Sequence, residues 1–92
     1  MIRSFRHKGL KRLYEEDDAR GVLVKHVPKL RNILARLDAA ASPEDMNLPG
    51  FYLHALKGEY RQFWAVTVRA NWRVIFRIAE GNAENVDYLD YH

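Results

Sequence analysis

The chain has 92 residues, of which 48% are hydrophobic and 12% aromatic, a composition typical of one globular domain with a single core. Lysines and arginines exceed acidic residues by 15 to 12, and residues 1–13 contain five of these basic side chains and no acid. The absence of cysteine excludes disulfides and thiolate metal sites, and no run approaches the roughly 20 apolar residues of a membrane span. The N-terminus lacks the apolar core of a signal peptide, so we expect a cytoplasmic protein.

The first half of the chain predicts a short strand followed by two helices. Residues 2–5 are the strand candidate, and the apolar spacing from His7 to about Glu15 is helical. A longer helical stripe runs over fifteen residues from Val27, with Pro28 in its first turn, where proline is tolerated. Ser42-Pro43-Glu44-Asp45 ends this helix and can cap one further turn. We expect the stripe to pack on a sheet; docking into a partner's groove is the alternative.

The second half predicts a run of strands. Residues 51–56 form the first strand, and a turn at Lys57-Gly58-Glu59 leads into a hairpin over residues 63–78. A turn at Gly81-Asn82 then precedes a last strand that extends from Asn85 to about Asp90. The order β-α-α-β-β-β-β predicts one α+β domain over residues 1–92, with two helices on one face of a mainly antiparallel sheet of four to five strands.

The hairpin is the most informative stretch. A three-residue loop, Ala70-Asn71-Trp72, would place Trp64 opposite Ile78 at one end of an apolar ladder suited to a core. A two-residue loop would shift the register by one and mix the two faces, so we predict the longer loop. In that register Arg69 lies directly opposite Arg73 on the outer face. Like charges in such a pair destabilise a sheet, which suggests that an anion binds there.

A set of polar side chains surrounds the outer face of this hairpin. Arg69 and Arg73 lie across the predicted loop, Lys57 follows the preceding strand, and Asp90-Tyr91-His92 close the chain. Cleavage of RNA by its own ribose 2′-hydroxyl needs a base, a cation for the phosphorane and an acid for the leaving 5′-oxygen. Arginine has a planar fork that matches phosphate oxygens, and histidine suits either proton transfer. The set is therefore chemically sufficient for RNA cleavage.

Each of these residues also has an ordinary interpretation. The arginines are typical of exposed strands, Asp90 suits a salt bridge and His92 a frayed chain end. His54 fits a sheet position and Asn71 a turn. The common enzyme templates are absent: there is no phosphate-binding glycine loop, no His-x-x-x-His metal helix and no nucleophile elbow. The four histidines lack metal-ligand spacing, so we expect neither a metal nor a cofactor.

Four segments carry a resemblance that covers the whole chain. They are the opening Met1-Ile2-Arg3-Ser4-Phe5 with His7-Lys8-Gly9-Leu10-Lys11, then Leu53-His54-Ala55-Leu56-Lys57-Gly58, the hairpin stretch Val66-Thr67-Val68-Arg69-Ala70-Asn71-Trp72-Arg73, and the closing Asp90-Tyr91-His92. The last two are the most specific. With these segments the chain resembles the HigB toxins of the RelE/ParE superfamily, from bacterial type II toxin–antitoxin systems. The resemblance implies a compact RelE-like fold, in line with the order of elements above.

The resemblance also implies a ribosome-dependent mRNA endonuclease that enters the A site and cuts the codon being decoded. The catalytic candidates by motif are Arg73, Asp90, Tyr91 and His92. The RNA-binding candidates are His54, Lys57, Asn71 and Arg69, the last with a less settled role. Composition further suggests contacts with ribosomal RNA from Lys8, Lys11, Arg12, Lys25 and Lys29. The implied partners are the 70S ribosome, mRNA and a HigA-type helix-turn-helix antitoxin that would neutralise the toxin and bind operator DNA.

Two alternatives remain open. The first is a ParE-like toxin of the same fold that poisons DNA gyrase, but such toxins lack a complete set of nuclease side chains. The second is a non-catalytic RNA-binding or partner-docking module. A binding module would give no cleavage, and its affinity for RNA would fall with salt as phosphate contacts are screened. Mapping the 5′ ends of mRNA after brief expression separates these possibilities.

Overall fold

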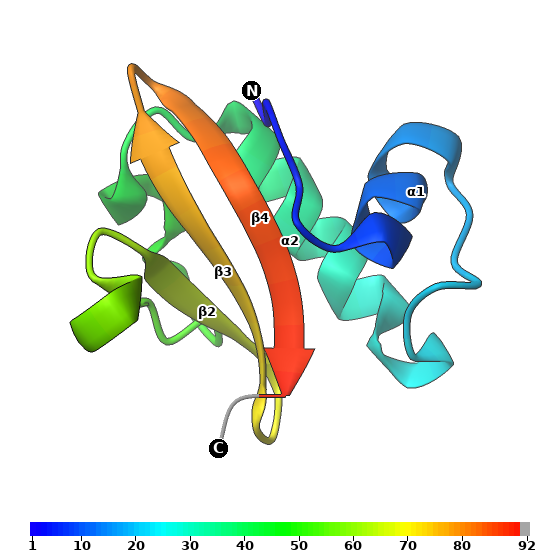
Figure 1. Cartoon of the computed structure of the whole chain (residues 1–92). Coiled ribbons are helices and arrows are strands. Elements are labelled where there is room, and N and C mark those ends of the chain that lie inside the picture. Colours follow the sequence, from blue (N-terminus) through cyan, green and yellow to red (C-terminus); the bar gives the residue numbers. More distant parts are fainter. Residues whose placement is uncertain (91–92) are drawn as a thin grey trace.

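Helices lie on one face of a four-stranded antiparallel sheet, as the computed structural model of residues 1–90 shows (Figure 1). The sheet has the order β1-β2-β3-β4, so each strand pairs with the next one along the chain. The elements of these residues are α1 (Lys8–Glu16), α2 (Val27–Ala39), β1 (His54–Ala55), β2 (Trp64–Arg69), β3 (Trp72–Ala79) and β4 (Asn82–Asp90), with short 3₁₀ helices η1 (Val24–His26), η2 (Pro43–Met46) and η3 (Gly58–Tyr60). This confirms the predicted α+β fold and its element order.

Both helices begin and end where local chemistry predicts. The ring of His7 caps α1 by accepting a hydrogen bond from the backbone N–H of Leu10 at 3.0 Å. Pro28 stands in the first turn of α2, and Ser42 and Asp45 form a capping box at the start of η2. Within residues 1–90, neither helix is long and apolar enough to cross a membrane.

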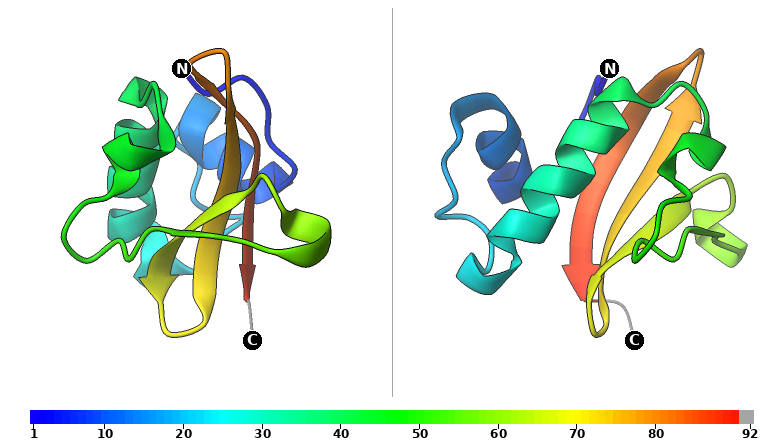
Figure 2. Two further views of the ribbon diagram at one scale, coloured as in Figure 1. Left: turned by 90° about the vertical axis from the view of Figure 1, so that its left-hand side faces the viewer. Right: turned by 180° about the vertical axis from the view of Figure 1, so that it is seen from behind.

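The main core fills the space between α2 and the sheet. α2 buries its apolar stripe there, which confirms the predicted packing on a sheet. The buried residues that α2, β2, β3 and β4 contribute are Leu30, Ile33, Leu34, Leu37, Val66, Val68, Val74, Phe76, Ala83, Val86 and Tyr88. The left-hand view of Figure 2 shows α2 on one side of the sheet and η3 on the other.

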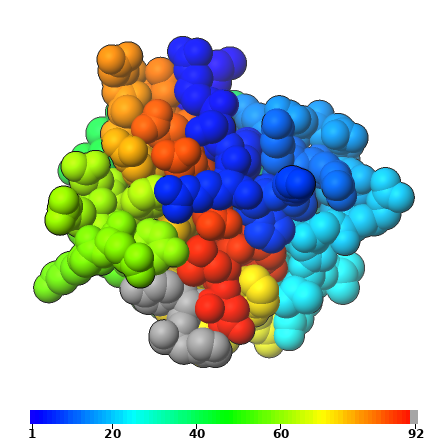
Figure 3. Space-filling view, viewed as in Figure 1, coloured from blue at the N-terminus to red at the C-terminus, as the bar shows by residue number. Residues whose placement is uncertain are grey.

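The predicted first strand forms only as two isolated parallel bridges, which join Ile2 to Ala83 and Phe5 to Val86. Its partner, β4, is irregular between these points, where Asn85 has a φ of 54° and the register with β3 shifts. The irregularity interrupts a continuous ladder, so residues 2–5 flank β4 without becoming a fifth strand. Figure 3 shows this N-terminal segment, in blue, lying across the molecule beside β4.

The hairpin has a two-residue turn, Ala70–Asn71, and the predicted three-residue loop is wrong. Arg69 lies opposite Trp72, and the register shifts by one between Thr67 and Arg69 because of a bulge at Val68. The extra residue in β2 compensates for the shorter turn, so the apolar alternation survives. As a result Trp64 pairs with Phe76, not with Ile78.

The bulge also overturns the predicted arginine pair. Arg73 lies opposite Thr67, whereas Arg69 lies opposite Trp72, which packs on the helix-side core. Opposed residues of a sheet share a face, so Arg69 and Arg73 belong to opposite faces. Like-charge repulsion across the strands is therefore avoided.

The predicted strand over residues 51–56 is reduced to His54 and Ala55, because Tyr52 has a φ of 52°, which breaks the extended conformation. The sheet face away from the helices carries a second apolar cluster beneath the chain that includes η3. Its buried members are Leu56, Phe63, Ala65 and Ile75, with Tyr60 and Leu89 at the margin. The chain that includes η3 therefore covers the middle of this face.

Gly9 and Gly21 allow two backbone segments to cross in close contact. A Cβ on Gly9 would lie 2.8 Å from the Cα of Gly21, closer than real Cβ contacts occur. Alanine within a helix is normally more favourable than glycine by about 1 kcal/mol. Here the backbone contact should reverse that preference.

We expect Gly9→Ala to lower the free energy of unfolding by about 2 kcal/mol, as overpacking against backbone does. Urea unfolding followed by circular dichroism measures the change. Glu15→Ala, at an exposed position of the same helix, is the control and should change stability by less than about 0.5 kcal/mol. Equal midpoints for the Gly9→Ala variant and the wild type would show that the crossing relaxes freely.

Candidate functional site

The hairpin turn and the end of β4 lie side by side. Trp72, the first residue of β3, pairs with Asp90, the last residue of β4, so the chain end is brought to the turn that contains Asn71 (Figure 1). Asp90 and Asn71 are both exposed at this edge of the sheet. Tyr91 and His92, predicted as catalytic, lie outside the described residues.

Arg73 is held at this edge by the turn itself. Its Nη1 donates to the carbonyl oxygen of Ala70 at 2.5 Å and to that of Trp72 at 3.1 Å. Its Nε is buried and has no hydrogen-bond partner within residues 1–90. Nη1 has two hydrogens and both are used, and the buried Nε lies on the other edge of the guanidinium, beside Nη2. This edge has the parallel N–H geometry that binds two oxygens of a phosphate or carboxylate.

His54 shares the face of Arg73. His54 pairs with Ala65, and Ala65 in turn pairs with Ile75, two residues from Arg73. The His54 Nδ1 lies 3.0 Å from the carbonyl oxygen of Tyr52. A carbonyl oxygen only accepts hydrogen bonds, so Nδ1 carries the proton. In the neutral form of the ring the unprotonated nitrogen is therefore Nε2.

Lys57 lies further from Arg73 than the sequence interpretation suggested. It follows Leu56, whose N–H donates to the carbonyl of Phe63 at 3.0 Å. Phe63 precedes Thr67, the partner of Arg73, by four residues, which corresponds to roughly 13 Å along an extended chain. Lys57 is exposed and adjoins a hollow lined by Gly58, Glu59, Arg61, Gln62, Phe63 and Arg77. Lys57 is therefore displaced along the sheet from the turn that positions Arg73.

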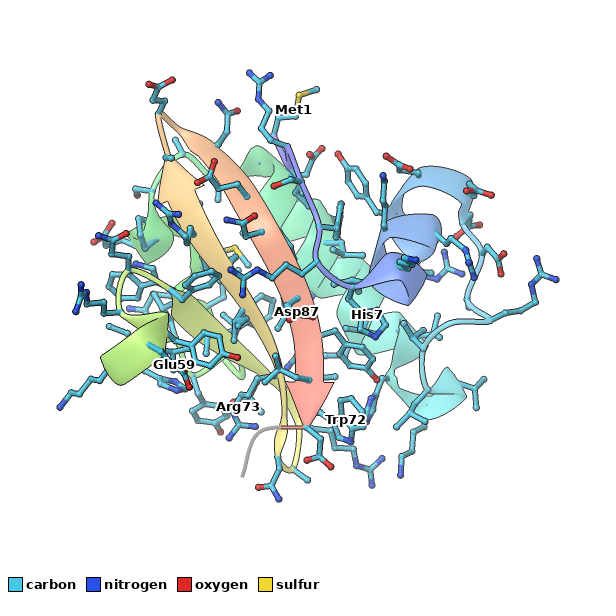
Figure 4. All side chains as sticks on the ribbon, in the orientation of Figure 1. Met1, His7, Glu59, Trp72, Arg73 and Asp87 are labelled. Carbon is cyan, nitrogen blue, oxygen red and sulfur yellow. The ribbon has the colours of Figure 1, made fainter. Side chains whose placement is uncertain are left out.

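Arg69 lies on the helix side of the sheet with its cross-strand partner Trp72, and Asp90, which also pairs with Trp72, shares that face, whereas Arg73 lies on the other. Burial and the charges of Lys25 and Arg69 lower the pKa of His26, the last residue of η1, which packs against Trp72 on the helix side. In Figure 4, Trp72 and Arg73 lie to opposite sides of the lower end of the sheet. The cross-strand partner of Arg69 is Trp72, so the two hairpin arginines face different surroundings.

The basic residues predicted to contact ribosomal RNA divide into two groups. Lys8, Lys11, Arg12 and Lys25 are exposed. Lys29 is engaged within the molecule, because its Nζ donates to the carbonyl of Gly50 at 2.9 Å and lies 5.0 Å from the centre of the Phe51 ring. Lys29 therefore holds the loop before β1, and the other four remain available to a partner.

A cluster of aromatic rings supports the functional edge from the helix side, and sequence analysis missed it. The rings of Trp72 and Tyr88 stack with centroids 4.7 Å apart. His26 is buried, and its Nδ1 lies 2.6 Å from the Tyr88 hydroxyl. His7 packs edge-on against Tyr88. Nothing in the residue pattern distinguishes a buried histidine directly before Val27 from an exposed one.

Burial lowers the pKa of His26 below its ordinary value, and the positive charges of Lys25 and Arg69 act in the same direction. Burial also raises the pKa of the Tyr88 hydroxyl, which therefore stays protonated. The pair is thus a neutral hydrogen bond. This hydrogen bond ties η1 to β4 and so fixes the strand that ends at Asp90.

Two further hollows lie elsewhere. The first is a groove of about 290 Å³ between α1 and α2, lined by Leu13, Tyr14, Asp17, Arg31, Leu34, Ala35 and Asp38. There the Tyr14 hydroxyl donates to Asp38 at 2.6 Å, which raises the pKa of Tyr14 to about 12. The second lies near Arg3 and Glu80. Among residues 1–90, no three His, Asp or Glu side chains converge as a metal site requires.

Comparison with known proteins places the chain in a family. A family model described as RelE-like toxin of type II toxin-antitoxin system HigB matches residues 3–92. The chain is 41% identical to the Endoribonuclease HigB of Proteus vulgaris, with both chains covered in full. It is 31% identical over 94 residues to Toxin HigB-1 of Vibrio cholerae serotype O1, covering 100% of this chain and 98% of that protein.

Fold and family match together define a RelE-like toxin, the protein component that an antitoxin partner counteracts in a type II system. Within that class, the chain belongs to the HigB family. The resemblance inferred from the hairpin stretch and the closing residues is thereby confirmed.

The buried His26 predicts how stability depends on pH. The unfolded histidine has a pKa near ~6.5, and the folded one has a lower pKa, so the unfolded chain binds more protons as the pH falls through this range. The free energy of unfolding should therefore decrease from pH 7 to pH 5. We expect His26→Gln to flatten this decline in urea titrations at several pH values, whatever its effect at pH 7.

Val24→Ala is a suitable control, since Val24 is an exposed neighbour that does not titrate. Its decline between pH 7 and pH 5 should match that of the wild type. An unchanged slope in the His26→Gln variant would assign the pH dependence to other groups.

Proposed function

We propose that this toxin is an endoribonuclease that cuts mRNA on the ribosome, at the codon in the A site, as a single domain acting in the cytoplasm. The observation that carries the proposal is the Arg73 guanidinium, held by the carbonyls of the hairpin turn on the same face as the His54 imidazole, with a buried Nε that has no hydrogen-bond partner within residues 1–90. The Proteus vulgaris relative is named an endoribonuclease, which supports the same activity here.

The proposed reaction is an attack of the ribose 2′-oxygen on the adjacent phosphorus. The 2′-hydroxyl loses its proton to a base, the bond from phosphorus to the 5′-oxygen breaks, and the 5′-oxygen takes a proton from an acid. The products are a 2′,3′-cyclic phosphate and a free 5′-hydroxyl. Arg73 would bind two non-bridging oxygens and stabilise the extra charge of the phosphorane.

Proton transfer would be divided between the two sides of this edge. The unprotonated Nε2 of His54 is suited to accept the 2′-hydroxyl proton, which adds a catalytic role to a residue first assigned to RNA binding. Asp90 and His92 remain the leading proton-transfer groups at the chain end. Tyr91 would stack on a base or hydrogen-bond a phosphate. Asn71 and Lys57 would contact nucleotides beside the cut.

Dependence on the ribosome fits an open site. The hollow near Lys57, the groove between the helices and the hollow near Arg3 are not lined by Arg73, His54 or Asp90. A surface site cannot orient a flexible strand alone, so another surface would position the mRNA. The exposed Lys8, Lys11, Arg12 and Lys25 would bind ribosomal RNA. A HigA-type antitoxin would block this function and bring the toxin to operator DNA.

Arg73→Ala should reduce the single-turnover rate of cleavage on ribosome-bound mRNA by about 100-fold or more, the loss typical of removing a transition-state donor. Arg73→Lys should recover only part of the rate, because an ammonium lacks the fork. Arg77→Ala is a matched control on the same strand and face, and should retain near wild-type activity.

Mapping of 5′ ends after brief expression tests the same proposal in cells. Codon-phased cuts that disappear in the Arg73→Ala variant are expected. Loss of DNA supercoiling without cuts would indicate a gyrase poison. RNA binding without cuts would indicate a non-catalytic module.

A further inference from the structure

Tyr52 presents its side chain to solvent from a strained backbone. The residue is 73% exposed, and its φ of 52° lies in the left-handed region. Large side chains rarely adopt this region, and such strain concentrates at functional positions. The exposed ring does not contribute to the core, so the strained backbone at Tyr52 points to a contact with another molecule.

The backbone on both sides of Tyr52 is fixed. The carbonyl of Phe51 accepts a hydrogen bond from Thr67 N–H at 2.7 Å, and the Phe51 ring is buried beneath Lys29. The carbonyl of Tyr52 accepts the Nδ1 hydrogen of His54 at 3.0 Å. Lys29 also bonds the carbonyl of Gly50. These contacts hold the left-handed turn in place.

The same contacts locate Tyr52 beside the proposed catalytic groups. Thr67, which binds the residue before Tyr52, is the cross-strand partner of Arg73. His54, which binds the carbonyl of Tyr52, is two residues further on and lies on the face of Arg73. Tyr52 thus borders the site on the side of β2, opposite the β4 end at Asp90.

We infer that Tyr52 stacks on a base of the mRNA next to the phosphate bound by Arg73, and so selects the nucleotide at that position. The inference rests on the proposed function and adds a specificity-determining residue to it. Exposed aromatic rings beside phosphate-binding arginines are the usual platforms for unpaired bases. A base splayed onto Tyr52 would also fix the ribose whose 2′-hydroxyl faces His54.

The left-handed backbone supplies a sharp test. Asparagine adopts this conformation more readily than tyrosine, so Tyr52→Asn should be at least as stable as the wild type in urea unfolding. The same variant removes the ring. Its single-turnover cleavage at subsaturating toxin should fall about 5- to 100-fold, the range for loss of one stacked base. Tyr52→Phe keeps the ring and should remain close to wild type.

An abasic nucleotide identifies the stacked position. When it is placed in turn at each codon position of a ribosome-bound mRNA, it should slow cleavage by the wild type at one position. At that position it should slow cleavage by Tyr52→Asn little further, because the ring is already absent. Val24→Ala, another exposed apolar position, is the control. If Tyr52→Asn cleaves all codons at the wild-type rate, the inference is overturned. If its binding to the antitoxin is weakened as well, Tyr52 contacts the antitoxin and not the mRNA.

The two proposals fail in different ways. If wild-type toxin cuts and Arg73→Ala does not, the nuclease proposal stands whatever Tyr52→Asn does. If the wild type does not cut ribosome-bound mRNA at all, both proposals are overturned together.

Discussion

The bulge at Val68 is the constraint on which the functional end of the sheet depends. By adding one residue to β2, it allows a two-residue turn without exchanging the two faces of the hairpin. The two-residue turn places Arg69 opposite Trp72, on the helix side, while Arg73 lies on the other face. An unbulged hairpin with a three-residue loop would have put both guanidinium groups on one face, where their repulsion would oppose pairing of the strands. The turn and the bulge together separate the two cations and keep the apolar residues of β2 on the core face.

The two faces of this end have separate tasks. On the helix side, Trp72, Tyr88 and His26 form a packed, neutral cluster that ties η1 to β3 and β4. On the other face, hydrogen bonds to backbone carbonyls of the turn and the loop position Arg73 and His54. The rigidity of the first face orients the second. Catalytic side chains need such fixed supports, because small displacements reduce rates sharply.

The sequence predicted the elements better than their pairing. Helical spacing and caps identified α1, α2 and η2, because these signals are local. The predicted hairpin register was wrong by two residues, a shift that alternation cannot detect because the apolar side chains of both strands keep their faces. Only Arg69, which lies on the helix side, reveals the difference. The positive φ of Tyr52, which shortens β1, was equally hidden, since tyrosine gives no signal for that conformation.

The candidate site was predicted by motif, while its chemistry required coordinates. The hairpin stretch and the closing residues pointed to Arg73 and Asp90, which the pairing of Trp72 with Asp90 brings to one edge. The tautomer of neutral His54 follows from its contact with the carbonyl oxygen of Tyr52. The orientation of the Arg73 guanidinium follows from its hydrogen bonds to the carbonyls of Ala70 and Trp72. These are backbone carbonyls, which every residue has, so the sequence does not identify them. Backbone atoms therefore set the tautomer and the direction of the side chains that the sequence names. The turn and the loop prepare the site before RNA binds.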